Sequence, residues 1–125
     1  MVPYFWVGVA GFFGALARFL LTGYIASRTL TPFPLGTLVV NVTGSILLGF
    51  LVTVGIQSIQ FPANLKPALA VGFLGSYTTF STWSYETLQL MENGNYVLAA
   101  LNVLVSMITG LAGMWAGFSV GRLFS

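Results

Sequence analysis

The sequence predicts an all-α membrane protein with four transmembrane helices. Hydrophobic residues make up 57% of its 125 residues and charged residues only 5%, so a soluble domain of this size would lack the polar surface to cover its core. A helix needs about 20 residues to cross the bilayer core. The length therefore allows four spans with short connections, and we expect no separate soluble domain.

Charges and prolines divide the chain into four apolar segments within a single domain, residues 1–125. The spans are expected at about residues 4–26, 35–56, 68–90 and 96–120. The prolines all fall at span ends or in connections: Pro3, Pro32, Pro34, Pro62 and Pro67. This placement favours helices, since backbone polar groups in lipid must be satisfied within the protein. The start MVPYFWVG lacks a positive region, so we expect a first span rather than a cleaved signal.

Composition excludes most catalytic chemistry. The chain contains neither cysteine nor histidine, which rules out disulfides, thiolate metal sites and histidine-based catalysis. Its only acids are Glu86 and Glu92, and its four basic residues are too few for a nucleic-acid-binding face. We therefore expect neither an enzyme nor a nucleic-acid-binding protein.

Glycines recur at helical spacing in the first and last spans. The two stripes are Gly8, Gly11 and Gly14, and Gly113, Gly117 and Gly121. Small residues let helices approach closely, and close approach drives helix association in lipid. We interpret both stripes as packing surfaces, against the same chain or against a second copy.

The few positive charges give almost no bias in orientation. With four spans, Lys66 and Arg122 lie on one side of the bilayer, and Arg28 lies on the other with Arg18 nearby. Positive residues on the cytoplasmic side normally fix the topology of a membrane protein. We therefore expect dual topology, with copies inserted in both directions.

Two charged residues fall inside predicted spans. Arg18 lies about 5 Å past the middle of the first span, at the rise of an α-helix, and intramembrane charges are functional candidates. The alternative is that its side chain extends to the membrane interface. Glu86 lies toward the end of the third span, in the same half of the bilayer, where it could pair with Arg18.

Polar residues follow one face of the second and fourth spans and crowd the third. The stripes are Thr37, Asn41, Gly44 and Ser45 in the second span, and Asn102, Ser106, Thr109 and Gly110 in the fourth. The third span adds Ser76, Thr78, Thr79, Ser81, Thr82 and Ser84. Singly, such residues often join helices by hydrogen bonds. Together, with Phe80 and Trp83 among them and no acid near any span centre, they favour a path for an anion, because amides and hydroxyls donate and aromatic edges are positive.

Three stretches resemble the CrcB/Fluc family of fluoride channels. They are GALARF in the first span, PLGTLVVNVTGS in the second and GFLGSYTTFSTWSYET in the third. The similarity extends over essentially the whole chain, including its length and number of spans. It implies an antiparallel, dual-topology homodimer with two narrow fluoride pores in the bacterial inner membrane.

The resemblance also assigns roles to individual residues. It implies a third helix that breaks near its middle, where backbone carbonyls of Gly75 and Thr78 from both subunits hold a structural sodium ion at the dimer centre. Asn41 and Phe80 match pore residues, and Trp83 stands where the family has its second pore phenylalanine. The other expected pore residues are Ser106, Asn102, Thr37, Ser81 and Thr82, while Arg18 and Glu86 are expected to be vestibular or structural.

A fluoride channel of this kind would export the ion passively and lower its concentration in the cytoplasm. Fluoride is small and strongly hydrated, so close donors must replace its lost water, and several weak sites in series allow entry and exit. One alternative is a small proton-coupled multidrug exporter, which needs a membrane-embedded carboxylate, whereas no acid precedes Glu86. A second alternative is a membrane subunit that transports nothing.

Overall fold

The structure is a computed structural model that describes residues 2–57 and 62–124. Its regular structure within those ranges is entirely helical, which confirms the all-α class. Three helices are long and apolar enough to cross a membrane: Pro3–Arg28, Leu35–Gly55 and Tyr96–Leu123. The chain is therefore a multi-pass membrane protein.

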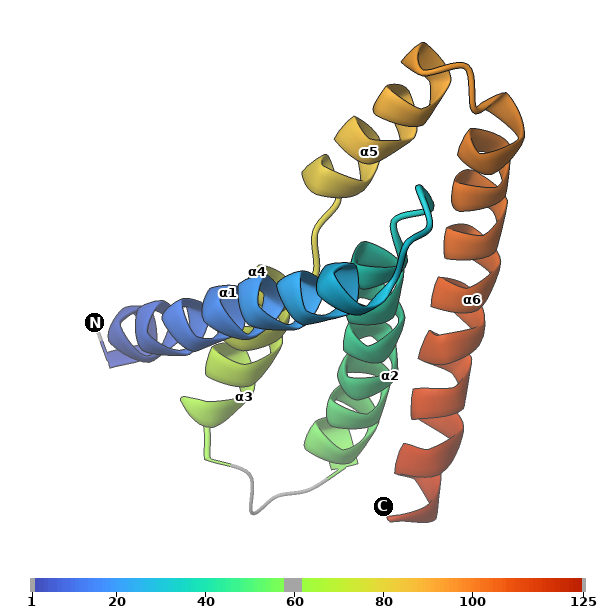
Figure 1. The fold of residues 1–125 in the computed structure, drawn as a ribbon. Helices are drawn as coiled ribbons and strands as arrows, with labels where there is room; N and C mark the ends of the chain where they lie inside the picture. Colours follow the sequence, from blue (N-terminus) through green and yellow to red (C-terminus); the bar gives the residue numbers. More distant parts are fainter. Residues whose placement is uncertain (1, 58–61, 125) are drawn as a thin grey trace.

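The helices follow one another with short connections (Figure 1). In chain order they are α1 (Val2–Arg28), α2 (Leu35–Gln57), α3 (Leu65–Pro67), the π-helix η1 (Ala68–Leu74), α4 (Gly75–Tyr77), α5 (Ser81–Glu92) and α6 (Tyr96–Leu123). Figure 1 shows α6 running alongside α2 and then α5, while α1 crosses α2. The segment expected to be the third span is thus divided among four short helices, and a count of four spans stays a prediction.

The close contact between α2 and α6 depends on the glycine stripe of α6. A Cβ added at Gly117 would collide with the carbonyl oxygen of Ile46, and one added at Gly121 would lie 2.8 Å from Cβ of Thr53. Gly113 faces Ile46 in the same way, with the added Cβ 3.1 Å from its side chain. The stripe therefore packs against a helix of the same chain, which the sequence left open.

The glycines of α1 make a similar contact with η1. A Cβ at Gly14 would collide with the carbonyl oxygen of Phe73, and one at Gly72 would lie 2.6 Å from the carbonyl oxygen of Val7. Gly8, the first glycine of the stripe, has nothing within 4 Å of an added Cβ. Two backbones therefore meet closely where α1 crosses η1, and Gly8 takes no part.

A small apolar cluster lies where α1 and α2 meet η1 and α4. Its buried members are Val40, Leu74 and Tyr77. The Tyr77 ring stacks on Phe73 with 5.8 Å between ring centroids, and its hydroxyl lies 2.9 Å from Oγ1 of Thr43. This cluster anchors the end of α4, directly before the chain leaves the helical conformation.

The reversal between α5 and α6 is a Schellman motif. Gly94 has φ +82°, a left-handed conformation that glycine adopts without strain. Its N–H donates to the carbonyl of Met91 at 3.1 Å, and the N–H of Asn95 donates to the carbonyl of Leu90 at 2.8 Å. These bonds satisfy two carbonyls at the end of α5 and direct the chain back along it as α6.

Candidate functional site

The helical backbone is interrupted between α4 and α5. Helix α4 ends at Tyr77, Thr78 is extended with φ −86° and ψ 159°, and α5 begins at Ser81. Gly75 is still helical, with φ −64° and ψ −33°, so it lies in the last turn before the interruption. An interrupted helix leaves backbone groups without their usual partners, and inside a membrane those groups need partners from the protein.

Asn41 on α2 supplies two of these partners. Its Nδ2 donates to the carbonyl of Thr79 at 3.0 Å, and its Oδ1 accepts from the N–H of Thr79 at 2.8 Å. In an unbroken helix the Thr79 N–H would donate to the carbonyl of Gly75. The Asn41 amide therefore replaces the helical partner of Thr79, and the Gly75 carbonyl loses this donor.

Thr79 connects the two halves of the interruption. Besides its backbone pairing with Asn41, its Oγ1 accepts a hydrogen bond from the N–H of Thr82 at 3.2 Å. The bond satisfies one of the free amides in the first turn of α5, as a capping side chain does. Thr79 was not among the residues assigned individually to the site from the sequence, where it is one of seven serines and threonines in the third span. Its pairing with Asn41, 38 residues away, produces no pattern in the neighbouring sequence that could have predicted it.

Arg18 lies against the end of α4. Its Nε donates to the carbonyl of Ser76 at 3.0 Å, and the side chain is half-buried. A cation is favoured at a helix C-terminus, where carbonyls carry partial negative charge. Among the described residues, no ion pair joins Arg18 to Glu86, so the pairing that their positions in the sequence allowed is absent.

An open groove of about 370 Å³ lies beside the interruption. Four of the predicted pore residues line it together with both predicted sodium ligands: Asn41, Phe80, Trp83, Ser106, Gly75 and Thr78. The same wall includes Thr79 and Ser45, which belonged to the predicted polar path but were not assigned individually to the pore. Residues from α2, η1, α4, α5 and α6 thus meet at one surface. Neither acid of the chain is among its lining residues.

The remaining predicted pore residues lie outside this groove. Thr37 and Glu86 line a second pocket of about 420 Å³, near the connection between α1 and α2. The Thr37 hydroxyl lies against the Glu86 carboxyl, whose Oε1 is buried without a hydrogen-bond partner among the described residues. Ser81 is exposed on α5, and Thr82 is half-buried beside it.

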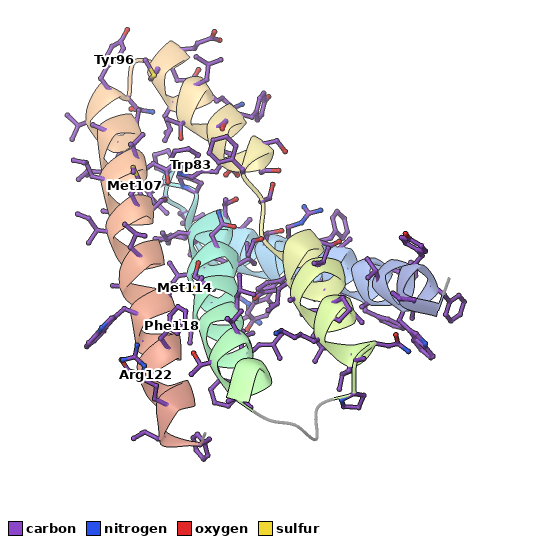
Figure 2. All side chains as sticks on the ribbon, turned by 180° about the vertical axis from the view of Figure 1, so that it is seen from behind. Trp83, Tyr96, Met107, Met114, Phe118 and Arg122 are labelled. Atoms are coloured by element: carbon purple, nitrogen blue, oxygen red, sulfur yellow. The ribbon has the colours of Figure 1, made fainter. Side chains whose placement is uncertain are left out.

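Trp83 lies between α5 and α6, near the level of Met107 (Figure 2). Its Nε1 donates to Oγ of Ser106 at 3.1 Å and, more weakly, to the carbonyl of Asn102 at 3.4 Å. Its ring lies 5.4 Å from that of Phe80, at an angle of 39°. Two aromatic rings from the start of α5 therefore share the groove wall with a serine of α6.

The donor groups in the groove suit an anion better than a cation. Two of the four serine and threonine hydroxyls here already donate to a helix carbonyl: Ser45 to Asn41 at 2.8 Å, and Thr78 to Leu74 at 2.9 Å. Asn41 uses one proton of its amide on Thr79 and keeps the second, and among the described residues the Thr79 hydroxyl accepts from the Thr82 N–H but donates to no partner. The described residues contain no group of three or more metal-ligating acidic, histidine or cysteine side chains. A cation would instead have to use backbone carbonyls.

Comparison with known proteins identifies relatives along nearly the whole chain. A family model described as CrcB-like protein, Camphor Resistance (CrcB), matches residues 5–118. A Geobacter metallireducens protein named fluoride-specific ion channel FluC is 42% identical over 116 residues, 93% of this chain and 94% of that relative. Proteins with the same name from Magnetococcus marinus and Methylococcus capsulatus are 43% and 47% identical over 118 residues.

The extent of these matches decides the family. The last two alignments each cover 94% of this chain. They cover 96% of the Magnetococcus protein but 52% of the Methylococcus protein, so this chain spans about half the length of the Methylococcus protein. The family model matches well over half of the chain. This chain therefore belongs to the CrcB family.

Proposed function

We propose that this chain forms a fluoride-selective ion channel, which lets fluoride leave the cytoplasm passively and so lowers its concentration there. The observation that carries the proposal is the groove beside the interruption between α4 and α5. It combines amide and hydroxyl groups with two aromatic rings and has no acid in its wall. Three relatives named fluoride-specific ion channel agree with this chemistry.

Fluoride selectivity follows from the kind of groups that replace its water. A pore for a small, strongly hydrated anion needs several close donors in series, each weak enough to release the ion. The second amide proton of Asn41 and the Thr79 hydroxyl are available for this purpose. The positive edges of the Phe80 and Trp83 rings add contacts that carry no full charge.

The segment from α3 to α5 is proposed to be the third of four spans, crossing the membrane in pieces. Interrupted backbone at membrane depth is tolerated only where protein buries it or it lines a cavity. The hydrogen bonds of Asn41 to Thr79 and of Arg18 to Ser76 supply such burial from two other helices. They support a stable interruption within the bilayer.

The functional unit is proposed to be an antiparallel, dual-topology homodimer with two pores. In the single chain Phe80 is 76% exposed and Gly75 is also exposed, although both line the groove. A second copy would enclose this open surface. The near balance of positive charges at the two membrane faces supports insertion in both directions.

A structural sodium ion is proposed at the dimer centre, bound by the carbonyls of Gly75 and Thr78. Hard cations prefer oxygen ligands, and carbonyls at an interrupted helix end are free to bind them. The Gly75 carbonyl fits this role because Thr79, its usual helical donor, is paired with Asn41. Bound sodium would hold the two helix ends in place and add positive charge near the anion path.

Fluoride efflux from liposomes tests the channel directly. The purified protein is reconstituted in vesicles loaded with potassium fluoride, and an electrode follows the fluoride released when a potassium ionophore removes the opposing voltage. Fast fluoride release with negligible chloride release from matched vesicles is the expected result. Flux that requires a proton gradient would instead indicate a coupled transporter, and no flux at all would indicate a subunit that transports nothing.

A further inference from the structure

A closed ring of hydrogen bonds connects α5 to α6 behind the groove. The Trp83 indole N–H donates to Ser106 Oγ, and the Ser106 hydroxyl donates to Asn102 Oδ1 at 3.3 Å. Asn102 Nδ2 donates to Thr87 Oγ1 at 2.8 Å. Thr87 Oγ1 then donates to the carbonyl of Trp83, also at 2.8 Å, which returns the ring to its first residue.

The direction of these bonds decides which protons remain. A serine hydroxyl and an indole each have one proton to donate. The proton of Ser106 is used on Asn102, and that of Trp83 is used on Ser106 with a weaker contact to the Asn102 carbonyl. Both residues line the groove, yet neither has a proton left for an ion there.

Burial distinguishes the members of the ring. Asn102 is fully buried, with 0% of its surface exposed, and it is not part of the groove wall. A buried amide with unmet hydrogen bonds is costly, so its partners hold it in one orientation. Asn102 also accepts the hydrogen bond from the Ser106 hydroxyl. It therefore holds Ser106 Oγ in the position where this oxygen accepts from the indole N–H of Trp83.

We propose that Ser106 and Asn102 are positioning residues: they hold the Trp83 indole in the groove wall so that it offers ring carbons, and not its N–H, to the ion. This role rests on the proposed channel function. It concentrates the donors for the anion at the interruption, in Asn41 and Thr79. Trp83 then limits the width of the path without binding the ion strongly.

Nuclear magnetic resonance of the indole N–H tests the ring of bonds without any flux measurement. The chain has three tryptophans, and the other two, Trp6 and Trp115, are 46% and 71% exposed, so both can be replaced by phenylalanine. In this ¹⁵N-labelled background the Trp83 N–H is expected to resonate downfield and to exchange slowly. Ser106→Ala should move it upfield and speed exchange, whereas Ser106→Thr should restore both. An N–H that is unaffected by Ser106→Ala, or that shifts strongly with sodium fluoride in the parent, would overturn the proposal.

A double-mutant cycle on fluoride flux tests whether Ser106 acts through Trp83. Ser106→Ala is expected to lower flux about two- to tenfold, the factor given by one lost hydrogen bond. Trp83→Phe should alter flux by a factor of its own, because it changes the width of the path at the groove wall, and Ser106→Ala should add no further change in that background. Ser119→Ala is the matched control on α6, since Ser119 donates only to the Trp115 carbonyl, within its own helix.

The two measurements separate this inference from the proposed function. Independent, multiplying losses in the flux cycle would show that Ser106 contacts the ion itself, and would overturn its positioning role. Absence of fluoride flux from the parent protein would overturn the proposed function, and with it the role of the indole in the path. The resonance would still establish the hydrogen bond in that case.

Discussion

Asn41 and Thr79 pair through both polar groups of the Thr79 backbone, although 38 residues separate them. The asparagine amide has the same donor and acceptor arrangement as a peptide group, so it replaces both partners that the interrupted helix no longer provides. The pairing gives Asn41 a structural role at the same place where its second amide proton remains available. The structural role and the proposed ion-binding role of Asn41 therefore depend on the same side chain.

Asn41→Ala should destabilise the protein as well as stop fluoride flux. The substitution leaves the N–H and carbonyl of the half-buried Thr79 without their protein partner, at up to about 1–3 kcal/mol for each group that water does not reach. Thermal unfolding in detergent would measure the first effect, and liposome efflux the second. Ser45→Ala is the control on the same helix for the stability measurement alone, because the Ser45 hydroxyl donates to the Asn41 carbonyl within α2. An Asn41→Ala protein as stable as the parent would contradict the pairing.

Arg18→Ala should lower stability through the loss of its bond to Ser76. A hydrogen bond from a charged group contributes about 1.5–3 kcal/mol, and here it also satisfies a carbonyl at a helix end. Arg18→Lys keeps the charge and should recover part of the loss. Arg28→Ala on the same helix is the control, since Arg28 is exposed and lies over the Tyr24 ring at 4.9 Å. Equal melting temperatures for Arg18→Ala and Arg28→Ala would show that the Ser76 contact adds nothing.

Gly117→Ala and Gly110→Ala form a matched pair on α6. At Gly117 the added methyl group meets the backbone of α2, and overpacking of this kind costs about 1–3 kcal/mol. At Gly110 nothing lies within 4 Å, so the single chain should tolerate the methyl group within about 1 kcal/mol. The melting temperatures of both variants would be compared in detergent. A Gly110→Ala protein that melts normally but no longer dimerises would place this face of α6 at the interface between copies.

Sodium replacement tests the proposed ion site at Gly75 and Thr78. A large organic cation such as N-methylglucamine cannot fit between backbone carbonyls at the distances that a hard metal ion requires. Fluoride flux should fall to the level of protein-free liposomes when it replaces sodium during purification and assay. Returning sodium should restore the flux, which distinguishes loss of the ion from denaturation. Unchanged flux in the absence of sodium would contradict the site.

The sequence predicts the class of the protein better than the geometry of its site. Hydropathy and the placement of prolines are sufficient for a helical membrane protein, because lipid allows the backbone few alternatives. The resemblance predicted four residues of one pore, and the structure places these four around one groove: Asn41, Phe80, Trp83 and Ser106. The prediction for Asn102 remains open, since this residue is buried behind the groove.

The remaining features depend on contacts between distant parts of the chain. No proline marks the interruption, and Thr78 leaves the helix only because Asn41 and Arg18, from two other helices, satisfy the backbone groups that this frees. The partner of the Gly117 stripe likewise follows from packing and not from spacing. The ring of bonds through Trp83 and Thr87 joins α5 to α6, and it depends on how the two helices pack after the turn between them, which the sequence pattern does not specify. Local patterns identify which residues are polar or small, but not which of them meet.

Phe80→Ile should abolish fluoride flux and leave assembly intact. Phe80 is 76% exposed in the single chain and lines the groove, so removing its ring changes the ion path more than the core. Isoleucine is apolar and branched but has no positive ring edge, and it therefore removes one contact that the anion is proposed to use. Flux would be measured in liposomes, and assembly by size-exclusion chromatography of the detergent-solubilised protein. Phe5→Ile is the control, because Phe5 is 63% exposed in the second turn of α1 and lies outside the groove. Normal flux through the Phe80→Ile protein would remove Phe80 from the path, whereas loss of the dimer would assign it to the interface between copies.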